Sequence, residues 1–359
     1  MSRRPRIVHV IDSLGRGGAE TQLVGLLPLL AEHYEITLVT LMPESDFPPE
    51  AVVAAERHCL GYTGFKSLPR CILALRRIIR RVRPDLVRSQ LYLSSVVARA
   101  ATPATIPLVF SIHSSMSHDA YLKNRFALPL ERLTYRRRHA LIAVSRYALD
   151  DFDRHVGVKG KAFVLHNSIA EAFFDRPPVE AWAPGRPFRL VAVGNLKEAK
   201  NYSLLMKAFR ELAGAPVSLD IYGEGALRPA LQAAIDADRL PIRLMGQSAD
   251  LPSLLAGYDG YVMPSLYEGF GIAAAEAMAA GLPMLLSDLV VLREVAQGEA
   301  LFFDPTDPAS FVGRVKDILA GRVDLARLSA EGRRIAAENY RRPAYVEKLR
   351  GIYAEVMAG

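Results

Sequence analysis

The chain has 359 residues, of which 50% are hydrophobic and 23% are charged, and its formal net charge is +7. This length exceeds what one hydrophobic core usually supports, so two domains are expected, and the composition excludes disorder. The two cysteines, Cys59 and Cys71, have neither a CxxC spacing nor nearby histidines, which excludes a disulfide framework and a zinc site. The positive charge calls for an anionic partner and leaves nucleic acid, anionic lipid and a diphosphate open.

The start of the chain holds an apolar run at residues 7–11 that follows several arginines and ends at Asp12. This run is shorter than a signal-peptide core, and no apolar run in the sequence approaches the roughly 18 residues of a membrane span. We therefore read it as a first β-strand. The expected location is cytoplasmic, with attachment to a membrane surface left open.

Short apolar segments alternate with longer helical ones along the chain. In the first half, strands are predicted at residues 6–11, 35–41, 85–88, 108–112, 140–144 and 162–165, and helices at 19–31 and 146–155. The alternation restarts with strands predicted at residues 188–194, 217–222, 242–246, 260–264, 283–286 and 300–303. This pattern predicts an α/β protein with two doubly wound parallel sheets, that is, two Rossmann-like domains.

A proline-rich stretch separates the two series. Residues 175–187 contain four prolines, so we place the interdomain linker there, between domains at 1–174 and 188–342. An amphipathic helix is predicted over 343–357. Because doubly wound sheets bind ligands beyond the carboxyl ends of their strands, two facing sheets imply a cleft with one substrate on each wall.

The clearest chemistry lies between Pro264 and Gly281. A strand runs into Glu268-Gly269-Phe270-Gly271, and an alanine-rich helix from Ile272 onward contains Glu276. Glycines before a helix leave N–H groups to face an anion such as a diphosphate, and carboxylates accept well from the vicinal hydroxyls of a sugar. The alternative is a capping Glu268 and an ion-paired Glu276.

This stretch resembles the signature of glycosyltransferase family 4, a large retaining family of the GT-B fold, in which two facing Rossmann-like domains line a cleft. The signature P-S-x-x-E-G-F-G-x-x-x-x-E-A-x-A-x-G is matched throughout by residues 264–281, and the resemblance covers essentially the whole chain. It implies that Glu268 contacts the donor sugar, that Glu276 holds the ribose and that the intervening turn lines the donor. It also implies that the helix at 343–359 returns to the first domain.

A second segment with the family's features opens the second domain. Lys200 precedes an amphipathic helix, where its ammonium would neutralise a departing diphosphate. The segment from Gly194 resembles the family's G-R-L-x-x-x-K-G, whose arginine and lysine bind the diphosphate, but Asn195 stands where arginine is usual. Contact of Asn195 with phosphate is left open, and Lys197 is either a substitute for the missing charge or a solvated side chain.

Two further loops resemble parts of the family's donor site. The turn at Gly223 and Gly225 resembles G-D/E-G-P-L, in which Gly223 lies next to the donor, whereas Gly225 has either that role or a structural one. Residues 245–251 resemble the loop around the nucleotide base, with backbone near Gln247 reading the base edge and Leu251 packing on it. UDP and GDP are the expected carriers.

The glycine loop after the first strand lacks the dinucleotide fingerprint, because Glu20 occupies the place of the third glycine. The family resemblance implies instead that the Gly17 and Gly18 backbone closes over donor phosphate and acceptor. Arg16 faces either an anionic acceptor or solvent.

His113 follows the strand at 108–112. A lone histidine is more often structural, but the family carries one at this position, beside the donor sugar, where it supports the reaction by hydrogen bonding.

Two other features point away from metal chemistry and toward a surface role. Asp151-Phe152-Asp153 spells a D-x-D triplet inside the predicted helix 146–155 and is read as a solvated helix face; no metal or other cofactor is expected. The helix predicted over residues 68–83 has one apolar face and is otherwise rich in arginine. Its arginines are either solvated or bind anionic lipid head groups, a surface that Arg136, Arg137 and Arg138 would extend.

The sequence thus predicts a retaining glycosyltransferase that moves a hexosyl or N-acetylhexosaminyl unit from a nucleoside-diphosphate sugar to an acceptor hydroxyl. The acceptor is expected to be a glycan or lipid-linked glycan of cell-surface polysaccharide, lipopolysaccharide or glycolipid biosynthesis. His113, Glu268 and Lys200 are the predicted catalytic residues. The alternatives are a soluble small-molecule glycosyltransferase, a nucleotide-sugar epimerase of this fold and a non-catalytic scaffold. No aromatic-interleaved basic patch supports nucleic-acid binding.

Overall fold

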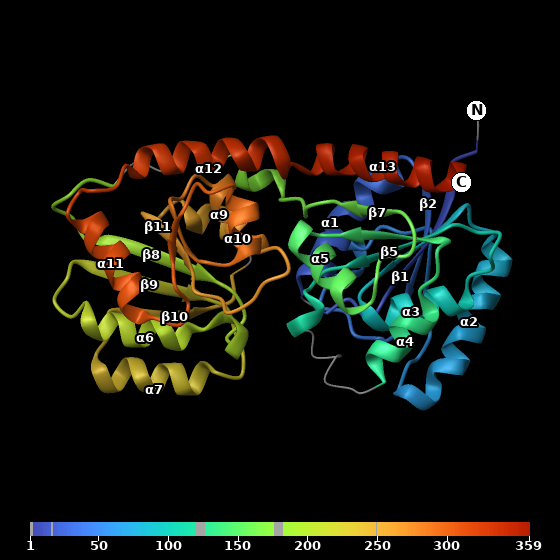
Figure 1. Ribbon diagram of the computed structural model, residues 1–359, viewed down its shortest axis with the longest axis horizontal. Helices are drawn as coiled ribbons and strands as arrows, with labels where there is room; N and C mark the ends of the chain where they lie inside the picture. Colours follow the sequence, from blue (N-terminus) through green and yellow to red (C-terminus); the bar gives the residue numbers. More distant parts are fainter. Residues whose placement is uncertain (1–2, 16, 119–125, 176–181, 249) are drawn as a thin grey trace. The chain divides into compact units, whose positions relative to one another are not determined.

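The computed structural model describes residues 3–15, 17–118, 126–175, 182–248 and 250–359 (Figure 1). The chain divides into two compact units. Domain 1 comprises Met1–Ser168 and Arg342–Gly359, and domain 2 comprises Ile169–Arg341. Each domain is an α/β unit built on its own parallel sheet, as predicted.

Domain 1 contains a seven-stranded sheet in the order β3-β2-β1-β4-β5-β6-β7, and all its neighbouring strands pair in parallel. The strands are β1 (Arg6–Ile11), β2 (Glu35–Thr40), β3 (Glu56–Cys59), β4 (Leu86–Gln90), β5 (Leu108–Ile112), β6 (His139–Ala143) and β7 (Ala162–Val164). The prediction missed β3. This edge strand has no apolar pattern, because most of its side chains are exposed.

Helices cover both faces of the first sheet. Its helices are α1 (Gly18–Ala31), α2 (Leu68–Val82), α3 (Tyr92–Ala101), α4 (Ala127–Thr134), α5 (Arg146–His155) and α13 (Arg342–Ala358), with 3-10 turns η1 (Pro49–Ala51), η2 (Phe65–Ser67) and η3 (Met116–His118). Figure 1 shows α1 and α13 on one face and α2, α3 and α4 on the other. The C-terminal helix α13 buries Tyr345, Val346, Leu349 and Tyr353 in the core of domain 1. The end of the chain is therefore part of this domain.

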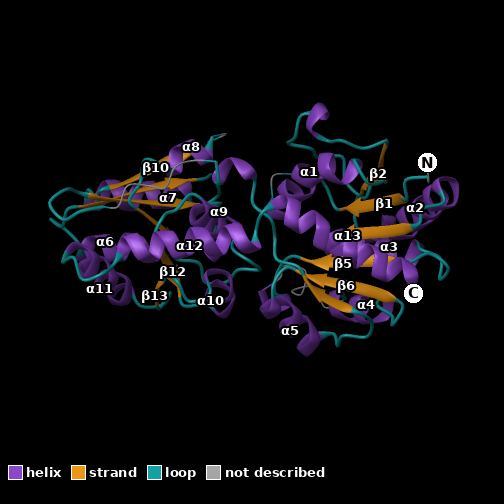
Figure 2. Cartoon of the chain, turned by 90° about the horizontal axis from the view of Figure 1, so that it is seen from above, coloured by secondary structure: helices purple, strands orange, loops and turns teal. Residues whose placement is uncertain are grey.

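Domain 2 contains a six-stranded parallel sheet in the order β10-β9-β8-β11-β12-β13. The strands are β8 (Phe188–Val193), β9 (Val217–Tyr222), β10 (Ile242–Gly246), β11 (Gly260–Met263), β12 (Met284–Ser287) and β13 (Leu301–Phe303). The helices are α6 (Tyr202–Glu211), α7 (Arg228–Asp238), α8 (Leu251–Leu255), α9 (Ile272–Ala279), α10 (Val290–Ala296), α11 (Pro308–Leu319) and α12 (Leu325–Asn339), with η5 (Glu171–Phe173) and η6 (Glu198–Lys200). Figures 1 and 2 show α6 and α11 on one face of this sheet and α9, α10 and α12 on the other.

The chain enters domain 2 earlier than the linker predicted at 175–187. The Ile169 N–H donates to the Tyr340 carbonyl at 2.7 Å, and Glu171 forms an ion pair with Arg341, so the segment from Ile169 already packs within domain 2. Of the predicted linker, residues 176–181 lie outside the described residues, and Trp182 packs edge-on against Phe188. The two described prolines of this stretch, Pro184 and Pro187, lie within domain 2, beyond the boundary after Ser168.

The D-x-D triplet is not a solvated helix face at Asp151. α5 spans the predicted residues, but its buried face includes Ala148 and Phe152, and Asp151 falls on that face at helical spacing. The Asp151 carboxylate accepts hydrogen bonds from the Ser117 N–H at 2.9 Å and from the Ser117 hydroxyl at 2.5 Å. The triplet therefore ties the segment after β5 to α5. Across the part of the chain that the structure describes, no three His, Cys, Asp or Glu side chains gather as a metal site.

No described helix has both the length and the apolar character that crossing a bilayer requires.

Candidate active site

In domain 2 the residues with predicted donor contacts follow the carboxyl ends of neighbouring strands. Gly194 and Asn195 follow β8, Gly223 follows β9, Gln247 follows β10 and Glu268 follows β11. Because these strands are parallel and adjacent, their carboxyl ends share one edge of the sheet. The fold thus brings segments that are far apart in the sequence to one edge.

Lys200 and Glu268 form an ion pair at this edge. The Lys200 Nζ lies 2.5 Å from the Glu268 Oε1, and the Ser265 hydroxyl donates to the same oxygen at 2.8 Å. Their side chains are 17% and 13% exposed, so the pair is shielded from bulk water yet remains accessible to a ligand. A diphosphate could replace Glu268 as the partner of Lys200. A sugar hydroxyl could replace Lys200 as the partner of Glu268.

Asn201 fastens the two loops that carry this pair. It adopts a left-handed backbone conformation with φ of 52°, and its Nδ2 donates to the carbonyls of Pro264 at 3.1 Å and Pro305 at 2.8 Å. The Leu266 N–H donates to the Ala199 carbonyl at 2.9 Å. Asn201 was not among the predicted site residues. The family pattern has glycine after its lysine, and asparagine is the side chain that best tolerates the same left-handed conformation.

The glycines of the turn after β9 allow a close backbone approach. A Cβ atom at Gly223 would collide with the Gly194 carbonyl oxygen, and one at Gly225 would meet the Leu196 carbonyl oxygen at 2.5 Å. The Leu196 N–H also donates to the Glu224 carbonyl at 2.9 Å. The structural role that the sequence analysis left open for Gly225 is thus shown, and Gly223 has such a role as well.

In the loop after β8, one buried side chain anchors the loop to the domain, and the side chains on either side of it are exposed. Leu196 is buried, whereas Asn195 and Lys197 are exposed. The Lys197 N–H donates to the Asn195 carbonyl at 2.9 Å, which keeps the loop tight. Both exposed side chains therefore lie on the loop surface near Lys200.

The turn that starts α9 has a backbone conformation that only glycine adopts easily. Gly271 has φ of 92°, and a Cβ there would meet the Leu292 side chain at 2.8 Å. Phe270 is buried and packs edge-on against Tyr340, with ring centroids 5.4 Å apart, which anchors the turn. Gly269 and Ile272 flank these residues and are half-buried. The first N–H groups of a helix lack intrahelical acceptors, so this end of α9 offers donors and a positive dipole end.

Glu276 lies one turn into α9 and is half-buried. Burial raises the pKa of the Tyr261 hydroxyl, and the charges of Glu268 and Glu276 raise it further. Both carboxylates thus lie within electrostatic range of the Tyr261 hydroxyl. The structure places the two signature glutamates on one side of domain 2, beyond β11.

The loop after β10 presents an exposed Gln247, and Leu251 is the first, half-buried residue of α8. The Asp250 carboxylate caps this helix by accepting from the Ser253 N–H at 3.2 Å. Ala249 lies outside the described residues.

In domain 1 the glycine loop begins at the end of β1. The Asp12 carboxylate is buried and accepts from the Ser94 N–H at 2.7 Å, at the start of α3. Gly17 precedes α1, and a Cβ there would collide with the Glu20 carboxylate; Gly18 is the first, exposed residue of the helix. Arg16, which was predicted to face an anionic acceptor or solvent, lies outside the described residues.

His113 follows β5 and is connected to buried polar groups. Its Nε2 lies 3.1 Å from the Gln90 Nε2, and the Gln90 Oε1 lies 2.8 Å from the His9 Nε2. Burial and the nearby positive charge of Arg88 lower the pKa of His113 to about 3, so its imidazole is neutral at physiological pH. Gln90, Arg88 and His9 were not among the predicted site residues. The sequence feature that could have identified them is the presence of polar residues within segments that are otherwise apolar and form strands.

A cavity of about 110 Å³ opens beside His113 in domain 1. Asp12, Ser111 and Ser114 supply polar groups to its wall, and Ile112 and Met116 supply apolar ones. The cavity lies beyond the carboxyl ends of β1 and β5. A small polar group that also has an apolar face fits such a lining.

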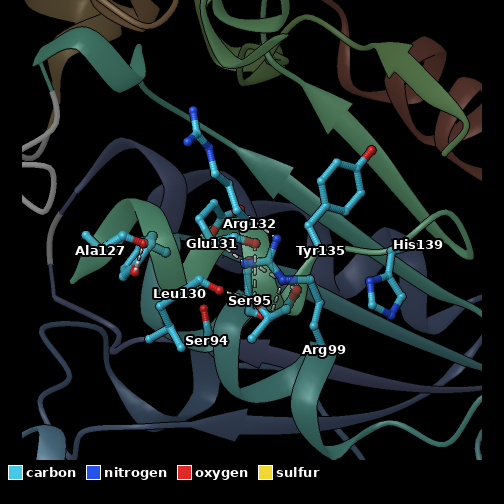
Figure 3. A network of polar contacts seen from close by, with 12 residues as sticks. Ser94, Ser95, Arg99, Ala127, Leu130, Glu131, Arg132, Tyr135 and His139 are labelled. Carbon is cyan, nitrogen blue, oxygen red and sulfur yellow. Dashed lines mark hydrogen bonds and ion pairs between the residues drawn. The ribbon is translucent and has the colours of Figure 1, made fainter. Parts of the chain in front are cut away.

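Glu131, which lines this cavity, forms a buried ion pair with Arg99 that connects α4 to α3 (Figure 3). The Arg99 Nη1 donates to the Glu131 Oε1 at 2.6 Å, and the second guanidinium nitrogen bonds the other carboxylate oxygen. The Arg99 Nε also donates to the Ser95 carbonyl at 3.1 Å, and its guanidinium lies 4.7 Å from the Phe110 ring centroid. This bidentate pair holds the two helices together.

Comparisons with known proteins agree with this arrangement. The model of Glycosyltransferase Family 4 matches residues 16–173, and the model of Glycosyl transferases group 1 matches residues 187–321. The N-acetylgalactosamine-N,N'-diacetylbacillosaminyl-diphospho-undecaprenol 4-alpha-N-acetylgalactosaminyltransferase of Campylobacter jejuni is 25% identical over 77% of this chain and 79% of its own length. The GDP-mannose-dependent alpha-(1-6)-phosphatidylinositol dimannoside mannosyltransferase of Mycobacterium tuberculosis is 27% identical over 69% and 68%.

Solved structures share the fold over nearly the whole chain. Sucrose-phosphate synthase from Thermosynechococcus elongatus superposes with a TM-score of 0.83 at 19% identity and covers 99% of this chain and 100% of its own. HepE of Anabaena in complex with UDP-glucose has a TM-score of 0.81 at 17% identity and covers 98% and 100%. The predicted GT-B fold is thereby confirmed. Because the two family models fall one on each domain, the chain belongs to the family 4, group 1 glycosyltransferases.

Proposed function

We propose that this glycosyltransferase transfers a sugar from a nucleoside-diphosphate sugar to an acceptor hydroxyl with retention of the anomeric configuration. The Lys200–Glu268 pair at the carboxyl edge of the domain 2 sheet carries the proposal. It combines a cation for a diphosphate with a carboxylate for sugar hydroxyls. The names of similar proteins support such a donor: HepE was solved with UDP-glucose, and the Mycobacterium tuberculosis relative is named GDP-mannose-dependent.

In the proposed reaction, donor binding separates the ion pair. Lys200 turns to the diphosphate, Glu268 accepts hydrogen bonds from the sugar hydroxyls, and Glu276 accepts from the ribose. The bond between the anomeric carbon and the diphosphate oxygen breaks, and the acceptor oxygen bonds to that carbon on the same face. The acceptor proton passes to the departing phosphate oxygen, so neither glutamate transfers a proton. Lys200 and the start of α9 stabilise the charge that develops on the leaving group.

The acceptor hydroxyl is proposed to bind in the cavity of domain 1, where Asp12 and the serines supply hydrogen-bond partners. His113 lines the same cavity, and its lowered pKa makes it a hydrogen-bonding group rather than an acid. A glycan or lipid-linked glycan is the proposed acceptor class, supported by the diphospho-undecaprenol-linked sugar in the Campylobacter jejuni relative's name. NMR of the product tests retention: inversion of the donor's anomeric configuration would contradict the mechanism.

Thermal unfolding tests the donor assignment. A UDP-, GDP- or ADP-sugar at 100 times its Kd should add about 2.7 kcal/mol to the free energy of unfolding of the wild-type protein. Glu276→Ala should abolish the stabilisation at the same ligand concentration, because the ribose loses its carboxylate partner. Glu211→Ala, which removes an exposed glutamate at the far end of α6, should retain it. An unchanged shift in Glu276→Ala would contradict the ribose assignment.

Membrane attachment is proposed for a basic pocket of domain 1, away from His113. The pocket has a volume of about 390 Å³ and is lined by Arg76, Arg136 and Arg138 beside Leu133, which is 70% exposed. Its loops precede β5 and β6, at the amino ends of strands whose carboxyl ends lie near His113. None of these three arginines has a carboxylate partner among the described residues. Cations beside an exposed apolar side chain suit an anionic lipid surface.

Vesicle co-sedimentation tests the membrane surface. The wild-type protein should bind vesicles that contain phosphatidylglycerol at low salt, release at high salt and ignore neutral vesicles. Replacing Arg76, Arg136 and Arg138 with glutamine should abolish the binding. The control replaces Arg322, Arg327 and Arg334, exposed arginines of domain 2, and removes the same charge. Equal binding to anionic and neutral vesicles would refute the membrane surface.

A further inference from the structure

A line of buried polar side chains runs through domain 1 to His113. His9 on β1 lies directly opposite Arg88 on β4, and Gln90 lies two residues further along the same strand, on the same side of the sheet. His9 and Gln90 are each 4% exposed, and Arg88 is 2% exposed. Burying a polar group this deeply destabilises the fold unless the group forms hydrogen bonds. The hydrogen bonds of these side chains therefore indicate what the buried arrangement does.

The hydrogen bonds of Gln90 determine where each imidazole carries its proton. The Gln90 Nε2 bears only hydrogens and donates, so the His113 Nε2 at 3.1 Å must accept with its lone pair. The hydrogen of neutral His113 is then on Nδ1. The Gln90 Oε1 accepts, so the His9 Nε2 at 2.8 Å donates. One amide thus holds the two histidines in opposite tautomers.

The charged groups around His113 keep it in this neutral form. Arg88 contributes a permanent positive charge from β4, which disfavours a second one on either imidazole. Of the acids that line the same cavity, Asp12 accepts from the Ser94 N–H and Glu131 is paired with Arg99. On α13, burial raises the pKa of the Tyr345 and Tyr353 hydroxyls, which keeps both neutral, and the charge of Arg88 lowers these pKa values in part.

We propose that Gln90, backed by His9, is a positioning residue that holds His113 as its Nδ1–H tautomer. His113 then offers a hydrogen-bond donor, rather than a lone pair, on its Nδ1 side. The donor would serve a substrate oxygen in sugar transfer, so this inference rests on the role of His113 in the proposed function. Gln90 acts only through His113 and contacts no substrate itself.

NMR of protein labelled with ¹⁵N-histidine measures the tautomers directly, without substrate. In the wild-type protein, the His113 signal should show hydrogen on Nδ1 and the His9 signal should show it on Nε2; His113→Phe and His9→Phe assign the two signals. Gln90→Glu should move the His113 hydrogen to Nε2, because a carboxylate accepts from both imidazoles. A wild-type His113 with hydrogen on Nε2 would overturn the proposal.

Kinetics supply the second measurement. Gln90→Glu and Gln90→Leu should lower kcat by about 10- to 100-fold, by analogy with the loss of a partner that orients a metal-bound histidine, with little change in donor KM. Gln22→Leu is the matched control, because Gln22 is an equally buried amide of the domain that bonds Ser168 and not His113. It should keep the wild-type kcat. An unchanged kcat in both Gln90 variants would overturn the positioning role.

A separate outcome concerns the proposed function itself. If His113→Phe transferred sugar at the wild-type rate, the role of His113 in the reaction would be refuted whatever its tautomer. The NMR measurement does not depend on transfer and therefore distinguishes that failure from a failure of the positioning inference.

Discussion

Replacing Lys200 with methionine should lower kcat for sugar transfer by about 10²- to 10³-fold, the usual cost of removing one preorganised group that stabilises developing charge. The departing diphosphate would lose the ammonium that Lys200 now holds beside Glu268. The loop after β8 offers little compensation, because Asn195 stands where the family usually has an arginine. Methionine keeps a similar length and apolar stem, so the fold should persist. Initial rates at saturating donor and acceptor measure the effect.

Two companion variants separate charge from packing. Lys200→Arg keeps the charge and should retain more activity than Lys200→Met. Its planar guanidinium forms hydrogen bonds to Glu268 with a different geometry from that of the lysine ammonium. Lys197→Met removes an exposed lysine of the same loop and should change kcat by less than about threefold, since surface charges act weakly through water. Equal rates in Lys200→Met and Lys197→Met would refute the role of Lys200.

Replacing Arg99 with methionine, or Glu131 with leucine, should destabilise domain 1 by about 3–5 kcal/mol. The two side chains are 0% and 4% exposed, so each single change leaves an uncompensated charge in the interior. The pair also joins α3 to α4 (Figure 3). In addition, the Arg99 guanidinium lies over the Phe110 ring. The double variant should recover most of the loss, because apolar groups often replace a buried ion pair without net cost.

Urea unfolding followed by circular dichroism measures this stability, and hydrogen exchange of α3 and α4 localises it. Tryptophan fluorescence reports on the other domain, because the single tryptophan, Trp182, packs in the core of domain 2. The control is Arg334→Ala, which breaks an exposed pair with Glu338 and should cost less than about 1 kcal/mol. A loss of less than about 1 kcal/mol in the free energy of unfolding of both Arg99→Met and Glu131→Leu would contradict the expectation.

Much of the fold could be predicted because its signals are local. β1 and β5 were predicted with the bounds that the structure shows, since each is a short and mostly apolar run. Amphipathic spacing likewise predicted α5 over Arg146–His155. β3 was missed because an exposed edge strand carries no apolar pattern. The prediction of a solvated Asp151 was wrong, because burial depends on distant segments. The boundary between the two compact units falls after Ser168, ahead of the proline-rich stretch at 175–187 where the linker was predicted.

The same division applies to the candidate site. The sequence by itself determined the family, since the signature at 264–281 is contiguous and its chemistry follows from residue type and spacing. Only the tertiary structure decided that Lys200 pairs with Glu268 and that Gln90 joins His9 to His113. These partners lie between 23 and 81 positions apart in the chain, where periodicity and motif spacing hold no information. Parallel strands bring them together, because their carboxyl ends share one edge of a sheet.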